Sequence, residues 1–393
     1  MEEWKEYRIG DICSKVCSGG TPSSKHSEYY DGDIPWLNTK EINFNRIYGT
    51  EKRITEEGLK KSSAKWIKEN SVIVAMYGAT AGKAAIAKIP LTTNQACCNL
   101  TINPSVADYR FVYYFLCYKF VELASLANGG AQQNLNAQII KDFEIPLPSL
   151  PEQEQIGNIL SSLDDKIEVN RKINENLEQQ AQALFKSWFV DFEPFKNGEF
   201  VESELGMIPK GWRVGKLGEI CNVFTGKKDV KQSQPIGLYP FFSCSPNHTY
   251  SNEYIYDGPS IIIAGNGSYT GRTSFYFGKF DLYQRTYACT IKEGFNEKII
   301  SFLYYMMKCL FEPVKMGGTR GSSIPYIVMN DIVLQKFALE NSLVEKYSDF
   351  AYNIMKQIQQ NNQESRRLAE LRDILLPKLM SGELKVNEIE DVL

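Results

Sequence analysis

The stretch from Glu152 to Trp188 decides the fold of this chain; it reads EQEQIGNILSSLDDKIEVNRKINENLEQQAQALFKSW. Apart from Gly157 it contains no glycine or proline, so we predict one long helix. Its apolar residues recur at steps of three and four, which is the spacing of a coiled-coil seam. A helix of this length extends over roughly 50 Å. Because an exposed apolar seam is unfavourable in water, the helix needs a partner.

A second stretch near the C-terminus, from Tyr347 to Leu375, repeats this spacing and supplies the partner. Polar residues interrupt both seams midway, and buried polar residues of this kind set register at some cost in stability. The predicted seam comprises Ile156, Leu163, Ile167, Asn170, Asn174, Leu177 and Leu184 of the first helix, and Phe350, Ile354, Ile358, Asn361, Leu368 and Leu375 of the second.

Each helix follows a globular stretch, and the two stretches share an order of features. Trp4 and Trp212 begin them, 208 residues apart. A strand, a G-x-x-x-G-[K/R] turn and a second strand recur at an offset of 189, which predicts a hairpin in each globule. Further on, Thr93–Cys97 aligns with Tyr283–Tyr287, and each globule ends on a strand, at 143–147 and 332–337. Two unrelated amphipathic helices are the alternative to this duplication.

The predicted fold class is therefore α+β, with two mixed α/β globules, two long helices and an internal repeat. The predicted parts are a globule (1–150), a helix (151–190), a connector (191–211), a second globule (212–340), a second helix (341–383) and a C-terminal tail (384–393).

Charge is distributed unevenly along the 393 residues, whose net charge is −3. The two globules carry about +1 and +4, whereas the first helix with its connector carries about −6, which is compatible with globules that contact phosphate. We find no signal peptide and no apolar run of membrane-spanning length. Nine cysteines without a CxxC pair fit a reducing cytoplasm, and with only two histidines we expect no metal site.

No catalytic pattern emerges. The segment Gly78–Lys83 resembles a nucleotide-binding P-loop, but only three residues separate its glycines and Ala84 follows the lysine. Two glycines closing a tight hairpin are the expected structure instead. We find neither a methyltransferase cofactor loop nor a Ser/His/Asp set, and we interpret Asp164–Asp165 as a solvated helix face. We therefore expect a chain without catalytic residues or a cofactor of its own.

Polar and aromatic residues in equivalent loops of both globules favour DNA reading, since amides, cations and hydroxyls contact base edges and phosphates. The candidates in the first globule are Thr21, Ser23, Lys25, Trp36, Asn38, Lys40, Tyr77, Lys83, Gln95, Gln132, Gln133 and Asn134. Those in the second are Lys227, Lys228, Ser243, Ser245, Asn247, Asn266, Tyr269, Arg272, Arg285, Arg320 and Ser322.

Four stretches resemble the specificity (S) subunit of type I restriction–modification enzymes. They are PLPSLPEQEQI (146–156), LFKSWFVDFEP (184–194), ELGMIPKGW (204–212) and LRDILLPKLMSGEL (371–384). The resemblance spans essentially the whole chain. One departure is the start of the second helix, ALENSL (338–343), which lacks the Pro-x-x-x-x-Gln pattern of the first.

The resemblance implies two target recognition domains held apart by an antiparallel coiled coil and related by a pseudo-twofold axis. Each domain would read one half of an interrupted site on double-stranded DNA. The helices would set the spacing and dock two methyltransferase (M) subunits, which use S-adenosylmethionine to modify adenine, and restriction (R) subunits would join that core. The exposed helix faces and the 188–194 segment are the expected docking surface.

Two other interpretations stay open. The first is a stand-alone DNA-binding protein that resembles antirestriction proteins and has no enzyme partner. The second is a coiled-coil scaffold whose globules bind protein rather than DNA. Neighbouring genes distinguish the first, and salt-dependent, sequence-selective DNA binding distinguishes the second.

Overall fold

The computed structural model describes residues 4–127, 134–310 and 325–388. The chain divides into two compact units, one formed by Met1–Ile167 with Arg366–Leu393 and the other by Glu168–Ser365. Each unit holds one globule and a segment of both long helices, α5 (Leu150–Phe185) and α10 (Asn341–Met380). Both helices therefore contribute to both units.

The first unit is built on three small sheets. A five-stranded sheet has the order β2 (Cys13–Ser18), β10 (Cys97–Ile102), β7 (Val72–Ala75), β8 (Ala84–Ala87) and β4 (Asn45–Ile47). A four-stranded sheet has the order β5 (Lys52–Ile54), β3 (Tyr30–Leu37), β9 (Leu91–Thr93) and β6 (Trp66–Ile67). Strands β1 (Lys5–Arg8) and β11 (Glu144–Leu147) pair with each other. The helices are α1 (Glu56–Lys60), α2 (Tyr109–Tyr118), α3 (Phe120–Ser125) and α4 (Ala137–Asp142).

The second unit has one larger sheet. Its order is β15 (Cys221–Thr225), β20 (Thr286–Ile291), β18 (Tyr256–Ala264), β19 (Thr273–Leu282), β16 (Tyr239–Phe242) and β17 (Thr249–Ser251). Strands β14 (Arg213–Lys216) and β21 (Lys336–Leu339) pair with each other, as do β12 (Phe200–Ser203) and β13 (Gly206–Pro209). The helices are α6 (Leu217–Ile220), α7 (Ile299–Leu310) and α9 (Met329–Val333).

The predicted duplication is confirmed by the strand order. The order β2-β10-β7-β8 of the first unit recurs as β15-β20-β18-β19 in the second, the β3–β9 pair recurs as β16–β19, and the β1–β11 pair recurs as β14–β21. The pairings among the first four strands are antiparallel in both sheets, whereas the β3–β9 and β16–β19 pairings are parallel. The two predicted hairpins are also confirmed, as β7–β8 and β18–β19. A strand predicted at 332–337 is wrong, because Ile332 lies in α9 and the strand is Lys336–Leu339.

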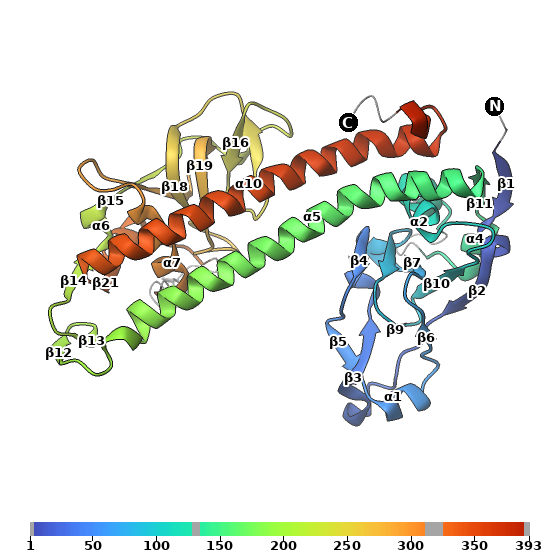
Figure 1. Ribbon diagram of the computed structural model, residues 1–393, viewed down its shortest axis with the longest axis horizontal. Helices are drawn as coiled ribbons and strands as arrows, with labels where there is room; N and C mark the ends of the chain where they lie inside the picture. Colours follow the sequence, from blue (N-terminus) through green and yellow to red (C-terminus); the bar gives the residue numbers. More distant parts are fainter. Residues whose placement is uncertain (1–3, 128–133, 311–324, 389–393) are drawn as a thin grey trace. The chain divides into compact units, whose positions relative to one another are not determined.

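Each unit has a single main core in which the globule packs on both long helices. In the first unit Phe111 and Phe115 of α2 join Leu160 of α5 and Leu379 of α10. In the second unit the corresponding helix α7 packs against Phe185 of α5 and against buried residues of α10. The two helices exchange roles, since α5 directly follows the globule in the first unit and α10 does so in the second (Figure 1).

The helix pair runs antiparallel within each unit. In the second unit Tyr347 donates its hydroxyl to the carbonyl of Ala181, 2.9 Å away, whereas Asn361 donates to Asn174, 2.8 Å away. Asn170 is 1 % exposed and donates to Glu364 at 2.7 Å. The interruption of the apolar seam is thus a hydrogen-bonded amide cluster, which satisfies the buried polar groups.

The predicted seam residues differ in their exposure. Buried are Ile156, Leu163, Asn170, Ile354, Ile358, Asn361 and Leu375, and partly buried are Ile167, Asn174, Leu177, Leu184 and Leu368. Phe350 is 40 % exposed, so its assignment to the buried seam is wrong. The neighbouring Ala351 is fully buried instead, because a helix turns 100° per residue and only one of the two faces the core.

The connector of the second unit is ordered by aromatic contacts. Phe192 and Phe195 lie with their ring centroids 5.2 and 5.3 Å from that of Trp212. Phe189, at the end of the π-helical Lys186–Val190 segment, lies 5.8 Å from the same ring. The apolar side chains of the 188–194 segment therefore pack against their own unit. The exposed residues of the segment are Asp191, Glu193 and Pro194.

Candidate nucleic-acid interface

Four loops of the first globule are joined by backbone hydrogen bonds into one surface, which we call rim 1 (19–26, 38–44, 76–83 and 94–96, with Asn134). Gly20 donates to the carbonyl of Thr93 at 2.8 Å, and Asn94 donates to that of Leu37 at 3.0 Å. The amide of Met76 donates to the carbonyl of Ala96 at 2.8 Å. Loops distant in sequence are thus fixed beside one another.

Rim 1 brings together most of the predicted residues of this globule. Exposed are Thr21, Ser23, Lys25, Lys40, Tyr77, Gln95 and Asn134, and partly buried are Asn38 and Lys83. Trp36 is a correction, because it is only 4 % exposed and its indole N–H donates to the carbonyl of Gly20 at 2.9 Å. Trp36 is therefore part of the packed support beneath the rim. Gln132 and Gln133 lie outside the described residues.

The two lysines of rim 1 have fixed neighbours. Lys83 follows the turn in which Gly78 and Gly82 both have positive φ, at 73° and 86°. Its ammonium donates to the side-chain oxygen of Asn43 at 2.7 Å. The hydrogen bond and charge of Glu51, 2.5 Å from Lys40, raise the pKa of Lys40. Both lysines are held by exposed groups that a phosphate can displace.

Rim 2 is the equivalent surface of the second globule (226–229, 243–247, 265–272 and 284–285). Tyr283 donates to the carbonyl of Phe242 at 2.9 Å, and Gly265 donates to that of Arg285 at 3.0 Å. The amide of Gln284 donates to the carbonyl of Lys228, also at 3.0 Å.

The predicted residues of the second globule are gathered on rim 2. Exposed are Lys227, Ser245, Asn247, Tyr269 and Arg285, and partly buried are Lys228, Ser243, Asn266 and Arg272. Burial lowers the pKa of Arg272, whose guanidinium donates to the carbonyl of Ser245. Arg320 and Ser322 lie outside the described residues.

Lys228 is a second correction. Its ammonium contacts Asp281 at 2.6 Å, Glu253 at 2.8 Å and the hydroxyl of Ser251 at 3.2 Å. An ammonium group has three donors, and here all three are used. Since Asp281 is only 4 % exposed, removal of Lys228 would leave a buried charge uncompensated. Lys228 is therefore fully engaged by groups of its own globule and stabilises the rim.

The hydrogen bonds also correct the alignment of the two globules. Asn94 and Ala96 occupy the positions of Tyr283 and Arg285, so the offset of the hairpins, 189 residues, continues through this loop. Gln95 therefore matches Gln284, which is exposed and was missed. An alignment of the two globules that kept the 189-residue offset through this loop would have matched Gln95 with Gln284.

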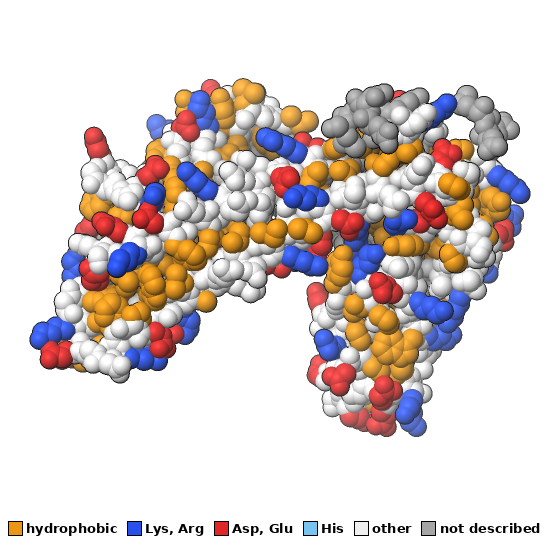
Figure 2. Space-filling model, viewed as in Figure 1, with side chains coloured by type: hydrophobic (Ala, Val, Ile, Leu, Met, Phe, Trp, Pro, Cys, Tyr) orange, Lys and Arg blue, Asp and Glu red, His pale blue; other side chains and the backbone are white. Residues whose placement is uncertain are grey.

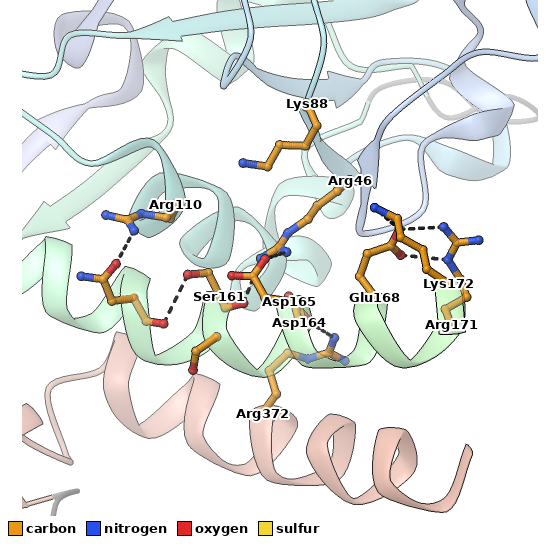
Figure 3. Close-up of polar contacts among 12 residues, drawn as sticks. Arg46, Lys88, Arg110, Ser161, Asp164, Asp165, Glu168, Arg171, Lys172 and Arg372 are labelled. Atoms are coloured by element: carbon orange, nitrogen blue, oxygen red, sulfur yellow. Dashed lines mark hydrogen bonds and ion pairs between the residues drawn. The ribbon is translucent and has the colours of Figure 1, made fainter. Parts of the chain in front are cut away.

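Other charged groups of the first unit hold the globule on the helices (Figure 3). Arg46 is 8 % exposed in its side chain and donates to Asp165 and to the carbonyl of Ser161, the latter at 3.0 Å. Asp164 accepts from Arg372 at 2.6 Å and from the hydroxyl of Tyr114 at 2.5 Å. The interpretation of Asp164–Asp165 as a solvated face is therefore wrong for Asp164.

The visible surface shows no large patch of one charge, because Lys and Arg alternate with Asp and Glu (Figure 2). Among the described residues, no helix combines the length and apolar character needed to cross a bilayer. That part of the chain also has no group of three or more His, Cys, Asp or Glu residues suited to a metal ion.

Comparisons with known proteins agree with this architecture. The sequence model of a family described as type I restriction modification DNA specificity domain matches residues 1–179 and 209–339. The type I restriction enzyme MjaIX specificity subunit of Methanocaldococcus jannaschii is 32 % identical, over 99 % of this chain and 95 % of that protein. The HindI specificity subunit of Haemophilus influenzae is 20 % identical, over 98 % of this chain and 100 % of that protein.

A solved structure shares the fold. The crystal structure of a type I restriction–modification system S subunit from M. genitalium superimposes with a TM-score of 0.62 at 20 % identity, and the match covers 96 % of each chain.

Proposed function

Because this chain belongs to the family of type I restriction–modification DNA specificity domains, we propose that each of its globules reads one half of an interrupted DNA site. The observation that carries this proposal is the repeated rim. Rims 1 and 2 share several backbone hydrogen bonds at equivalent positions but differ in their exposed side chains. The similar backbones place the side chains of the two rims at equivalent positions, and because these side chains differ, they favour different bases. We expect two half-sites of different sequence.

In this proposal the two recognition domains are residues 1–150 and 212–340. Hydroxyl, amide and ammonium groups of the rims hold phosphates, and a few amide and guanidinium groups reach base edges. The chain recognises DNA and leaves the chemistry to two methyltransferase subunits, which bind S-adenosylmethionine and modify adenine. Restriction subunits join this complex, which acts on cytoplasmic DNA.

The exposed helix faces are the proposed docking surface for those subunits. Val169 and Ile173 lie one turn apart on α5 and are 48 % and 42 % exposed. Exposed apolar pairs on a helix favour burial against a partner. Amide exchange at these two residues should slow when the methyltransferase subunit is added, and unchanged exchange would remove α5 from the docking surface.

The experiment that tests the proposed function is methylation sequencing of host DNA with this gene present and deleted. An interrupted adenine-methylated motif that disappears on deletion supports the specificity role. Unchanged methylation beside an intact partner methyltransferase would contradict it. Binding of the purified chain to DNA should also weaken steeply with salt, whereas a scaffold that binds protein would show no such DNA binding.

A further inference from the structure

The same tight turn carries an exposed glutamine in both rims. In rim 1 the amide of Cys97 donates to the carbonyl of Asn94 at 3.2 Å, which closes a turn with Gln95 as its first central residue. In rim 2 the amide of Thr286 donates to the carbonyl of Tyr283 at 3.0 Å, and Gln284 takes the same position. Both glutamines are exposed, although each turn lies between buried strand residues.

Each turn is fixed on both sides of its glutamine. The residue before it donates to the carbonyl that ends a neighbouring strand, Leu37 in rim 1 and Phe242 in rim 2. The carbonyl of the residue after it accepts from Met76 in rim 1 and from Gly265 in rim 2. The glutamine backbone therefore has little freedom, and its side chain leaves each rim from an equivalent point.

In both rims a glycine packs closely against the strand residue that precedes the turn. A Cβ atom on Gly19 would lie 2.1 Å from the carbonyl oxygen of Thr93, and one on Gly226 would lie 1.7 Å from that of Leu282. Thr93 and Leu282 each stand two residues before their glutamine. Such distances exclude any side chain, so glycine is required at the same place in both globules.

The side-chain amide is oriented in each turn by the loop that follows this glycine. Thr21 donates its hydroxyl to Oε1 of Gln95. The Nε2 group of Gln284 donates to Asp229 at 3.4 Å. No partner is found within the described residues for Nε2 of Gln95 or for Oε1 of Gln284. An amide already held at one atom loses less side-chain entropy when it binds.

We propose that Gln95 and Gln284 are equivalent specificity-determining residues and that each recognises an adenine in its own half-site. A glutamine amide can donate to N7 of adenine and accept from its N6 amino group in the major groove, a pattern that no other base pair presents there. The next residue differs, since Ala96 is buried whereas Arg285 is exposed. The two half-sites therefore share an adenine and differ at a neighbouring base. This inference rests on the proposed function, because it requires half-site reading.

The test is methylation sequencing of host DNA in cells that express the full chain with its methyltransferase subunit. Gln95→Ala should relax one adenine of one half-site, with about a tenfold loss of discrimination at that base, and leave the other half-site unchanged. Gln284→Ala should do the same in the other half-site. Gln95→Glu retains the shape and should disfavour adenine at the same base. The matched controls are Gln138→Ala and Asn222→Ala, exposed amides outside the rims that should leave the motif intact.

The outcomes separate base reading from the alternatives. A wild-type chain that directs no interrupted motif overturns the proposed function, and the inference with it. A wild-type motif whose base preferences survive both glutamine substitutions overturns the inference alone. If the methyltransferase complex of a variant modifies no site, the binding of the purified complex to DNA duplexes that differ at one base is measured instead. Uniformly weakened binding to all of them, in both Gln95→Ala and Gln95→Glu, overturns the adenine assignment.

Discussion

At the scale of single residues, Asp164 shows how one carboxylate joins three elements of the first unit. Its two oxygens accept from Arg372 of α10 and from Tyr114 of α2, while the residue itself belongs to α5. The side chain of Asp164 is 15 % exposed and that of Arg372 is 26 % exposed, so solvent only partly screens the pair. The charge of Asp164 raises the pKa of Arg372 against the opposing effect of burial.

Asp164→Ala should lower the free energy of unfolding by about 2–3 kcal/mol, because it leaves Nη1 of the half-buried Arg372 and the buried phenol of Tyr114 without their acceptor. Urea denaturation measures this loss. Glu370→Ala is the control, since Glu370 is an exposed carboxylate on α10 in the same unit. A loss no larger than that of the control would show that solvent replaces the contact.

Residue patterns could not reveal which polar side chains are already engaged. Trp36 and Lys228 have the types expected of DNA contacts, yet their partners are Gly20 and Asp281. Lys228 and Asp281 are 53 residues apart, and Arg46 and Asp165 are 119 apart. Only the tertiary fold sets such pairs, whereas Thr21 lies in a loop that the preceding Gly19 and Gly20 mark in the sequence.

At the scale of elements, the start of α10 departs from the family pattern but has its own cap. Glu340 accepts from the backbone amides of Ser342 and Leu343, at 3.0 and 2.8 Å. In α5 the corresponding anchor is Gln153, which is 1 % exposed and donates to the carbonyl of Pro148 at 3.0 Å. Two different side chains therefore fix the two helix starts.

Glu340→Gln should lower stability by about 1 kcal/mol at neutral pH. Burial acts to raise the pKa of Glu340, but the hydrogen bonds from Ser342 and Leu343 outweigh it, so the pKa is lowered. A carboxylate with a lowered folded pKa stabilises above its unfolded pKa, and this contribution is lost as the pH falls through the folded value. Thermal melts of both proteins should therefore converge in acid. Glu345→Gln, on an exposed site of α10, should show no such convergence.

The amide cluster of the seam makes a prediction about paired substitutions. Asn361→Leu alone leaves the side-chain oxygen of Asn174 without its donor and should cost about 1–2 kcal/mol. Asn174→Leu and Asn361→Leu together remove both partners of this hydrogen bond and should cost less than the two single changes added together. Denaturation of the four proteins gives this comparison. A double variant that loses the full sum or more would show that the cluster is a stabilising network.

The elements themselves could be predicted to different extents. The long helices and both hairpins follow from period and glycine spacing, which are local signals. The strand at Lys336–Leu339 was misplaced because α9 precedes it with a similar apolar composition. The Phe350 assignment was wrong because the core requires Ala351 and Tyr347 at that turn, a choice made by the packing of α7.

At the scale of the whole molecule, each long helix is continuous through both units. Inserting one heptad after Ile167 and one after Ser365 preserves the contacts inside each unit, because these are the unit boundaries. We expect the gap between the half-sites to change and both half-site sequences to persist. Methylation sequencing gives both readouts. An unchanged gap with altered half-sites would contradict the idea that the helices set the spacing.

The central claim is that each globule independently determines one half-site. Methylation sequencing of host DNA, directed by chains in which residues 1–150 or 212–340 are exchanged singly for the globule of a relative with another motif, tests it most directly. The account predicts that each exchange replaces one half-site, keeps the other and leaves the gap between them unchanged. A single exchange that alters both half-sites, or neither, while the methyltransferase remains active would contradict it.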